Sequence, residues 1–324
     1  RSDDGGTVTG RFSMSNPNLQ QIPSRGFIGK KMRELFIPDE GCTWGSFDYS
    51  QQEPRIVVHY ALKIYLDKEP KADEEQLPIN LIESLEKIEE AYKDPDKDVD
   101  FHQAVADMAQ ISRTMAKTIN LGLFYGMGKI KLASELNLTK PQANTLFNTY
   151  HEKAPFVKKL SQDLIEFAED NKLLFTLGDR FCRFNKWETK DRAWNNASNR
   201  YEPVPILSEE DAKTAFKAEL LDKYKDHIAD NYMSDFTKYY KPAFTYKALN
   251  RLIQGSAADQ TKKAMIDVFK EGITPLIQVH DELDISVYSE EQKKKVIEIM
   301  QSAVPLRVPC KVDCEVGPSW GEIE

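Results

Sequence analysis

The feature that most limits the fold of this chain is a short stretch near its C-terminus, Pro275–Val287, which reads PLIQVHDELDISV. Two apolar runs flank the polar triplet His280-Asp281-Glu282, and this pattern predicts a β-hairpin with acids at its tip. Hairpin turns usually favour Gly or Asn, and adjacent acids repel each other. A cation bound at the tip would offset that repulsion. The alternative interpretation is a solvated acidic turn.

A third acid is expected at the end of another strand. The segment Thr43–Tyr60 opens as a short strand that ends at Asp48, and helical spacing of apolar residues follows Pro54. A carboxylate at a strand–helix junction is well placed to bind a metal. Asp48 could equally cap the helix that follows, and the sequence does not decide between the two.

Ser112–Gly126, SRTMAKTINLGLFYG, is predicted to be a helix that stops at Gly126. Arg113, Lys117, Leu121 and Tyr125 follow at steps of four residues, so they share one stripe of the helix. Two cations one turn apart suit a polyphosphate, and an aromatic side chain suits a base or a sugar. An amphipathic core helix with two solvated cations is the alternative.

The remaining pattern mixes helices with short strands, which indicates an α+β fold. A hairpin is expected at Leu174–Phe184 and one long helix at Phe244–Phe269. Asn185–Pro205 is interpreted as a polar loop, followed by a capped helical run from Ser208 to Tyr240. Two charge-rich stretches, at about 65–100 and 186–243, are interpreted as insertions.

Composition sets outer limits on location and partners. The 324 residues carry a formal net charge of -8, which argues against nonspecific adhesion to nucleic acid but allows a locally basic groove. The 4 cysteines include no CxxC pair, so we expect reduced core thiols in an intracellular protein. No membrane span or signal peptide is expected, which predicts a cytoplasmic location, or the host cytoplasm for a viral protein. Because the sequence starts with Arg1, we expect a fragment, a processed product or part of a split protein.

Together these features indicate one chemistry. Asp48, Asp281 and Glu282 supply acids that could hold two Mg²⁺ ions, and Arg113 and Lys117 supply positive charge for phosphates. Two metals with such cations are typical of phosphoryl or nucleotidyl transfer from a nucleoside triphosphate.

The same segments resemble the motifs of family A (Pol I-like) DNA polymerases. Residues 48–55, DYSQQEPR, resemble motif A, Arg113–Gly126 resembles motif B on the fingers helix, and Val279–Glu282, VHDE, resembles motif C. Residues 10–23, GRFSMSNPNLQQIP, and the pair Gln254-Gly255 resemble two further segments of the family. The short spacing from His102 to Arg113 is similar to that of phage T7-type enzymes.

The resemblance implies a role for each matching residue. Asp48 and Asp281 would ligate two Mg²⁺ ions with the Tyr49 carbonyl, and Glu282 would support them. Lys117 would also serve as a proton donor to the leaving pyrophosphate, and Glu53 would block a ribose 2′-OH and bond to Tyr125. The residues implied to contact the incoming dNTP are Arg113, Lys117, Leu121, Tyr125, His102, Gln51 and Glu53. The residues implied to contact the primer–template DNA are Arg11, Asn18, Gln20, Asn250, Gln254 and His280.

The resemblance also implies a right-hand architecture, with an antiparallel palm sheet backed by helices and mainly helical fingers. The palm would comprise residues 1–60 and 244–324, and the fingers residues 61–243 with the two insertions. The thumb and exonuclease regions of the family precede motif A, so we expect neither here and no proofreading. An upstream polymerase fragment or a processivity factor is then a candidate partner.

Two positions depart from the family pattern. Leu121 stands where Phe or Tyr is usual, which implies weak acceptance of dideoxynucleotides, and Tyr246 stands where bacterial relatives carry a basic residue. Three alternatives remain: a single-subunit RNA polymerase, a noncatalytic primer–template-binding part of a split polymerase, and a metal-dependent nuclease. Glu53 disfavours the first, the intact acids and cations the second, and the Arg/Lys/Tyr stripe the third.

Overall fold

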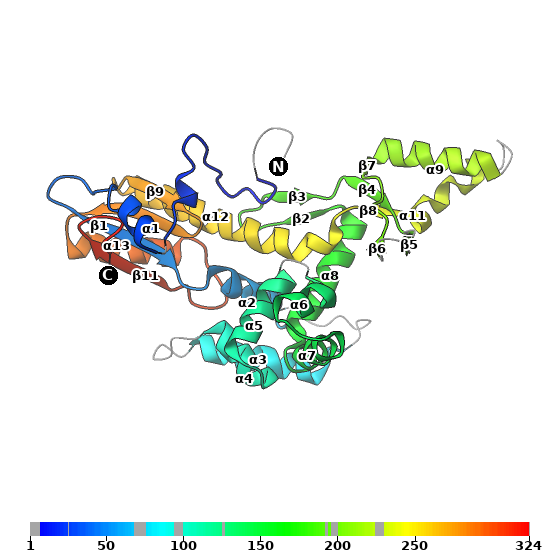
Figure 1. Ribbon diagram of the computed structural model, residues 1–324, viewed down its shortest axis with the longest axis horizontal. Coiled ribbons are helices and arrows are strands. Elements are labelled where there is room, and N and C mark those ends of the chain that lie inside the picture. The colour runs from blue at the N-terminus through cyan, green and yellow to red at the C-terminus, as the bar shows by residue number, and fades with distance from the viewer. Residues whose placement is uncertain are drawn as a thin grey trace.

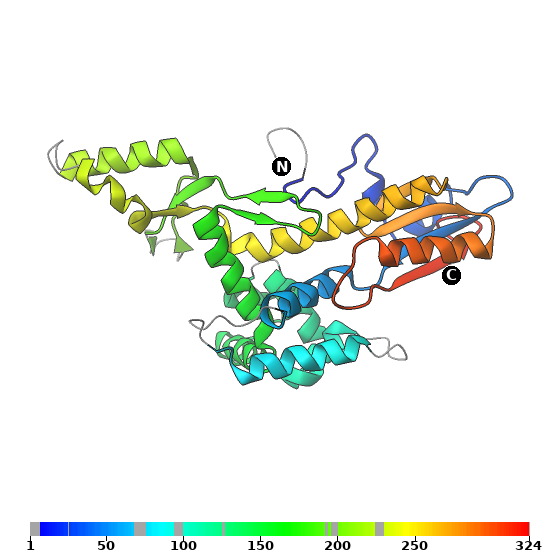
Figure 2. The ribbon, with the colours of Figure 1, turned by 180° about the vertical axis from the view of Figure 1, so that it is seen from behind.

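The structure is a computed structural model that describes residues 7–24, 26–67, 76–93, 100–124, 127–191, 194–195, 200–223 and 230–323. Figures 1 and 2 show an elongated molecule with a β-sheet at one end, a helical body below its middle and a protruding mixed segment at the other end. The chain is therefore α+β, as its pattern of apolar residues predicts.

An antiparallel sheet of four strands, in the order β11-β1-β10-β9, forms the first end. The strands are β1 (Thr43–Tyr49), β9 (Pro275–Val279), β10 (Glu282–Val287) and β11 (Val312–Gly317). On one face, alternate residues such as Phe47 and Leu283 pack against helices α12 (Ala248–Lys270) and α13 (Glu290–Ser302). Because side chains alternate along a strand, the other face receives the polar residues of β1 and β10. The hairpin predicted at Pro275–Val287 is confirmed.

The N-terminal part of the chain lies beside this sheet. It includes a 3₁₀ turn, η1 (Leu19–Gln21), and a short helix, α1 (Gly26–Arg33). Trp320 follows β11, and its ring stacks on Trp44 of β1 with centroids 6.0 Å apart. These contacts cover part of the polar face and leave the ends of β1 and β10 accessible.

A body of helices follows β1 and shares the largest hydrophobic core. Its helices are α2 (Gln52–Tyr65), α3 (Ile79–Lys93), α4 (Phe101–Ala109), α5 (Arg113–Phe124), α6 (Lys129–Glu135), α7 (Lys140–Lys153) and α8 (Pro155–Asn171). Helix α3 belongs to the stretch at about 65–100 that was interpreted as an insertion, yet Leu85 and Ile88 on one of its faces are buried in this core. Each such side chain contributes about 1.5–3 kcal/mol through burial, so α3 is part of the framework.

The long helix α12 connects the sheet to the rest of the molecule (Figure 1). It begins later than predicted, because Phe244 has a left-handed φ of 66° and residues Thr245–Lys247 form a 3₁₀ turn, η3. The predicted hairpin is confirmed as β2 (Leu173–Phe175) and β3 (Phe181–Arg183), and it lies along α12. A Cβ at Gly255 would lie 2.7 Å from Thr176, so this glycine permits the close approach.

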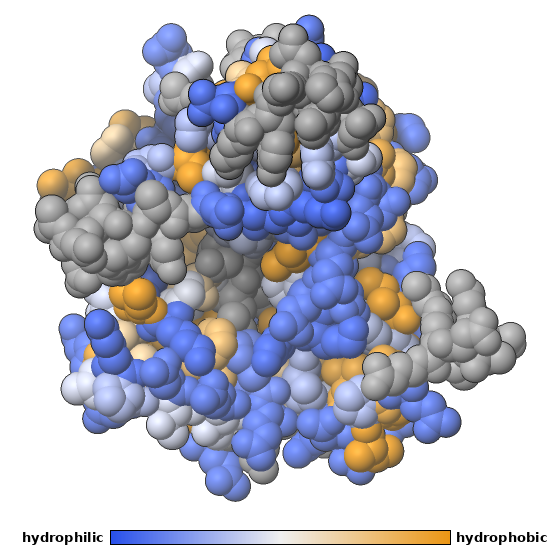
Figure 3. All heavy atoms as spheres, turned by 90° about the vertical axis from the view of Figure 1, so that its right-hand side faces the viewer, coloured by the Kyte–Doolittle hydropathy of each residue, from blue (hydrophilic) through white to orange (hydrophobic). Residues whose placement is uncertain are grey.

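Residues 186–243 form a protruding unit with its own small core around Trp187, Phe216, Phe236 and Tyr240. Its elements are β4 (Lys186–Thr189), β5 (Trp194–Asn195), β6 (Arg200–Tyr201), β7 (Leu207–Ser208), α9 (Glu209–Lys223), η2 (Asp230–Asp235), α11 (Phe236–Tyr239) and β8 (Tyr240–Pro242). The interpretation of Asn185–Pro205 as a loop is wrong, since β4 pairs with β7 and β8. The predicted helical run to Tyr240 is confirmed as α9 and, among the described residues that follow, as the 3₁₀ helix η2 and the short helix α11. Viewed from this end, the surface is mostly hydrophilic with scattered apolar spots (Figure 3).

Two global expectations are settled in part. The four cysteines are free, but only Cys182 is buried, so the expectation of core thiols is wrong for the other three. No helix among the described residues is long and apolar enough to cross a membrane.

Candidate active site

Two of the predicted acids, Asp48 and Asp281, lie close together where β1 ends and β10 begins. Asp48 lies opposite Glu282 across the strand pair, and the Tyr49 N–H donates to the Asp281 carbonyl at 3.4 Å. Burial, followed by the charges of Asp281 and Glu282, raises the pKa of Asp48 to about 8, and burial also raises the pKa of Asp281. Protein atoms crowd the Asp48 carboxyl on the side of the strand ends and raise its pKa, but the residue is still exposed to solvent. Water therefore screens part of the repulsion and reduces its effect on stability.

Asp48 is not a helix cap. The residue that precedes α2 is Gln51, in a left-handed conformation with φ 54°. The alternative interpretation of Asp48 as a capping residue is therefore wrong, and its carboxyl is available to a ligand. Tyr49, by contrast, is anchored, because its phenol donates to the Met300 carbonyl at 2.6 Å.

Acids that repel one another at strand ends fit a divalent cation, because carboxylate oxygens are its preferred ligands. Among the described residues, no three acidic, His or Cys side chains converge on one point as a complete metal site. Asp48 and Asp281 would therefore supply part of a coordination shell, and oxygens of a bound substrate or of water would complete it.

We expect the Asp48 carboxyl to make the metal-free protein less stable as the pH rises. The folded chain holds this proton up to a higher pH than the unfolded chain, in which Asp titrates near about 3.9. The folded state is therefore favoured at pH 4 and loses this advantage as the pH rises towards 8. In EDTA, the melting temperature of the wild type should fall by roughly 1–3 °C relative to Asp48→Asn between pH 5 and 8.5.

Addition of Mg²⁺ at pH 8.5 should raise the melting temperature of the wild type by the amount that it lost and leave that of Asp48→Asn unchanged. Differential scanning fluorimetry over the pH range tests both statements. Parallel pH profiles for the wild type and Asp48→Asn would contradict the proposed strain at this site.

Glu53 and Gln51 extend the site into the first turn of α2. Glu53 forms an ion pair with Arg11, whose side chain comes from the N-terminal loop. Burial raises the pKa of Glu53, and the charge of Arg11 opposes this shift. The Gln51 side-chain oxygen accepts from the Phe101 N–H at 2.7 Å, which ties this end of the sheet to the start of α4.

The predicted cations lie on α5, close to the start of α4. Arg113 and Lys117 are both exposed, and Leu121 is half-buried on the same helix. Arg113 forms an ion pair with Asp100, with its Nε 2.6 Å from Oδ2. The Arg113 guanidinium, which was predicted to bind a phosphate, is therefore paired with a carboxylate, and the sequence did not reveal this partner. Tyr125, the last residue of the predicted stripe, lies outside the described residues.

His102 is held in one orientation by a buried asparagine. Its Nδ1 lies 3.0 Å from the Asn120 side-chain nitrogen, and the Tyr150 hydroxyl donates to the Asn120 oxygen. Burial, then the charges of Lys117 and Arg113, lowers the pKa of His102 to about 4. The ring is therefore neutral at pH 7, and since Nδ1 accepts, Nε2 carries the proton. Asn120 lies within Arg113–Gly126, the segment that resembles motif B, and the sequence did not reveal its bond to His102.

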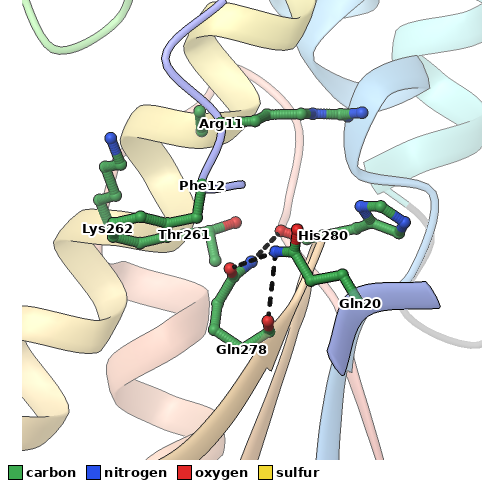
Figure 4. Close-up of a pocket in the computed structure, with 8 residues that line it drawn as sticks. Arg11, Phe12, Gln20, Thr261, Lys262, Gln278 and His280 are labelled. Atoms are coloured by element: carbon green, nitrogen blue, oxygen red, sulfur yellow. Dashed lines mark hydrogen bonds between the residues drawn. The ribbon is translucent and has the colours of Figure 1, made fainter. Parts of the chain in front are cut away.

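Three of the predicted DNA contacts, Arg11, Gln20 and His280, line a pocket beside the β9–β10 turn (Figure 4). The Gln20 side-chain nitrogen donates to the Gln278 side-chain oxygen at 3.1 Å, and Gln278 donates to the His280 carbonyl at 2.6 Å. His280 has a left-handed φ of 56°, which these bonds support. The sequence did not single out Gln278, although it lies two residues before His280.

The other predicted DNA contacts lie apart from this pocket or are engaged locally. Asn250 and Gln254 are one turn apart on α12 and are half-buried. The buried Asn250 side-chain nitrogen has no hydrogen-bond partner among the described residues. Asn18 caps η1, and its side chain accepts from the Gln20 N–H at 3.2 Å. One hydrogen-bonding group of the Asn18 side chain is therefore already used within the N-terminal loop.

The sequence matches the model of DNA polymerase family A over residues 3–203 and 213–322. It is 33% identical over 350 residues to a DNA-directed DNA polymerase of Pseudomonas phage M6, covering 98% of this chain and 44% of the relative. It is 32% identical over 325 residues to DNA polymerase I of Geobacillus stearothermophilus, covering 97% of this chain and 30% of the relative. The chain thus spans less than half of either relative.

A solved structure is also similar. The polymerase domain of Pol1 from M. smegmatis, in complex with DNA primer-template and dNTP, matches with a TM-score of 0.64 and 27% sequence identity. The match covers 97% of this chain and 46% of that chain. With the acid pair and the cationic helix in place, these similarities lead to one conclusion: the chain belongs to DNA polymerase family A.

Proposed function

We propose that this chain carries template-directed DNA polymerase activity, adding a dNMP from a dNTP to a primer 3′-OH. The observation that carries the proposal is the pairing of Asp48 and Asp281 at adjoining strand ends. Gln51 joins these strand ends to the start of α4, where Asp100 pairs with Arg113 of α5. Acids for metals and cations for phosphates are the two requirements of this chemistry. Membership of the family supports the same reading.

Asp48 and Asp281, with the Tyr49 carbonyl, are the residues that would hold two Mg²⁺ ions. Such ions supply activation of the primer hydroxyl and stabilisation of the leaving oxygen. Glu282 places a further negative charge beside Asp48. The role of the protein in this proposal is to fix the oxygens of Asp48, Asp281 and Tyr49 at the end of the sheet.

Arg113, Lys117 and His102 would bind the triphosphate. His102 offers Nε2–H as a neutral donor, since Asn120 occupies Nδ1. Lys117 is exposed and one turn from Arg113, so it could donate a proton to the leaving pyrophosphate. Arg113 would exchange its bond to Asp100 for one to phosphate. Gln51, Leu121 and Tyr125 would complete the nucleotide site.

The primer–template would lie across the pocket of Figure 4 and the exposed side of α12. The proposed contacts are Arg11, Asn18, Gln20, Asn250, Gln254 and His280. Amide and guanidinium donors suit the minor groove, where acceptors are shared by all base pairs, so these contacts can test pair shape without reading sequence. The similar M. smegmatis structure contains primer-template and dNTP, which supports the proposal that this chain binds both.

We further propose a palm made of residues 1–60 and 244–324 and fingers made of residues 61–243. The core that α3–α8 share supports their grouping in the fingers, and it continues into α2 and α12, where the fingers would meet the palm. The separate core of residues 186–243 supports its description as an insertion.

Extension of a primed DNA template with Mg²⁺ and four dNTPs tests the proposal. Elongated primers are the expected product. Retention of DNA binding without extension would point instead to the noncatalytic primer–template-binding role.

We expect Glu53→Ala to admit ribonucleotides. Glu53 is mostly buried beside Arg11, so its removal opens space where a 2′-OH would otherwise clash. Discrimination between dNTP and rNTP, measured as the ratio of kcat/KM values, should fall on the order of 10²-fold.

Glu53→Gln is the matched control, because it keeps the size of the side chain and should retain most of the discrimination. If Glu53→Ala discriminates as well as the wild type, Glu53 is not the steric barrier.

A further inference from the structure

A row of polar residues lies behind the acids, on the same face of the sheet. Ser46 and Asp48 alternate along β1, and Glu282 and Asp284 alternate along β10. The register places Ser46 opposite Asp284 and Asp48 opposite Glu282. Neighbours directly across an antiparallel pair have Cβ atoms about 5 Å apart, so the four side chains are in mutual reach.

One carboxyl oxygen of Glu282 accepts two hydrogen bonds. Ser46 Oγ lies 3.0 Å from Glu282 Oε1, and the indole Nε1 of Trp320 lies 3.2 Å from the same oxygen. Two donors on one oxygen fix the plane of the carboxylate. The position of the negative charge beside Asp48 is thereby fixed as well.

Ser46 itself is held by a buried acid. Asp284 has no exposed surface, and its Oδ1 accepts from Trp44 Nε1 at 3.0 Å and also contacts Ser46 Oγ. Ser46 has a single hydroxyl hydrogen, so it cannot donate to Glu282 and Asp284 at once. Both contacts are satisfied when Asp284 donates to Ser46 and Ser46 donates to Glu282.

A neutral Asp284 agrees with its surroundings. Its Oδ2 is buried without a hydrogen-bond partner among the described residues. An unpaired oxygen of an ionised carboxylate would be costly in the interior, and the carbonyl oxygen of a neutral acid costs less.

We propose that Ser46 and Asp284, backed by Trp44, are positioning residues that hold Glu282 in the orientation used by the polymerase site. The inference rests on the proposed function. None of these three side chains needs to touch substrate. Their effect passes through the hydrogen bond from Ser46 to Glu282.

Ser46→Ala tests the proposal with little risk to folding, because it removes one oxygen from a buried strand position. Single-nucleotide incorporation should show kcat lowered roughly tenfold, the loss expected for one hydrogen bond to a charged group. The KM for dNTP should stay within about twofold, since the nucleotide contacts remain. Ser46→Thr keeps the hydroxyl and suits a strand, so it should retain at least about half of kcat.

A double-mutant cycle shows whether Ser46 acts through Glu282. Once Glu282→Gln has been introduced, Ser46→Ala should lower kcat little further. Losses that multiply in the double variant would overturn the proposal, since they would show independent effects. Equal losses in Ser46→Ala and Ser46→Thr would also overturn it, because a packing defect would then explain both.

The indole N–H signals of ¹⁵N-labelled protein provide a readout that does not depend on activity. The chain has 4 tryptophans, and Trp44→Phe and Trp320→Phe assign the two signals of interest. Ser46→Ala should shift the signals of both Trp44 and Trp320 and leave that of Trp187 in place, because Trp187 lies in the separate core of residues 186–243. Unmoved signals would show that the network does not connect the two carboxyls.

The failures are distinguishable. A wild type that extends primers beside a fully active Ser46→Ala variant would overturn the positioning role and leave the proposed function standing. A wild type that extends no primer would overturn the proposed function and, with it, this inference.

Discussion

Asp281→Asn should abolish primer extension, with the rate of nucleotide incorporation lowered on the order of 10³-fold or more. Asparagine keeps the shape of the side chain but removes the charge that would hold a metal at the β9–β10 turn. Because burial raises the pKa of Asp281 and the neighbouring acids repel, the variant should be at least as stable as the wild type. Rapid-quench measurement of a single incorporation gives the rate, and a thermal melt checks the fold.

Asp313→Asn is the matched control. Asp313 lies opposite Asp48 on β11, is exposed, and pairs with Lys311 at 3.3 Å. It is an acid beside the same strand end with no proposed role in the reaction, so its replacement should change the rate less than about threefold. Equal losses in the two variants would mean that net charge, rather than the Asp48–Asp281 pair, governs activity.

Lys117→Ala should have the second largest effect. Lys117 is exposed on α5, and its charge is felt at His102, so it belongs to the proposed triphosphate site. Loss of one preorganised charge that stabilises a transition state costs about 10²–10³-fold in kcat. If Lys117 also protonates the pyrophosphate, Lys117→Arg should recover binding of dNTP but only part of kcat, because arginine gives up a proton far less readily.

Lys140→Ala controls for the loss of a surface charge, since Lys140 is exposed at the start of α7. It should leave single-turnover incorporation unchanged. A Lys117→Ala variant with a raised KM but an unchanged kcat would contradict the transition-state role and leave only ground-state binding.

The elements that the sequence predicted well are those with strong local patterns. The β9–β10 hairpin has two apolar runs around a polar turn, and the β2–β3 hairpin turns around Gly178 and Asp179. Such signals depend on residues a few positions apart, so the chain reveals them directly. Helix α5 was likewise expected, with its exposed Arg113 and Lys117 on one stripe.

What the sequence could not reveal depends on pairing across long separations. Strand β4 has few residues and pairs with β8 more than 50 positions later in the chain, so its segment resembled a polar loop. The bond between Ser46 and Asp284 follows from a strand register that joins residues 238 positions apart. Without the register, Ser46 is only a serine in an apolar strand.

The candidate site was likewise predictable in its local features but not in its long-range contacts. Its acids and cations were recognisable from residue type and motif. Their present partners were not, because Asp100 on Arg113 and Arg11 on Glu53 are products of how the helices and the N-terminal loop pack. The role of Asn120 in orienting His102 depends on hydrogen bonds to His102 and Tyr150, which come from two other helices.

The most direct test of the central claim is template-dependent incorporation of single nucleotides. Four primed DNA templates that differ only in the first unpaired base are each offered the four dNTPs one at a time with Mg²⁺. We predict that each template directs addition of its complementary dNMP and that the Asp281→Asn protein adds none. Addition that ignores the template base, or an Asp281→Asn protein as active as the wild type, would contradict the assignment of a metal-dependent, template-directed polymerase to these residues.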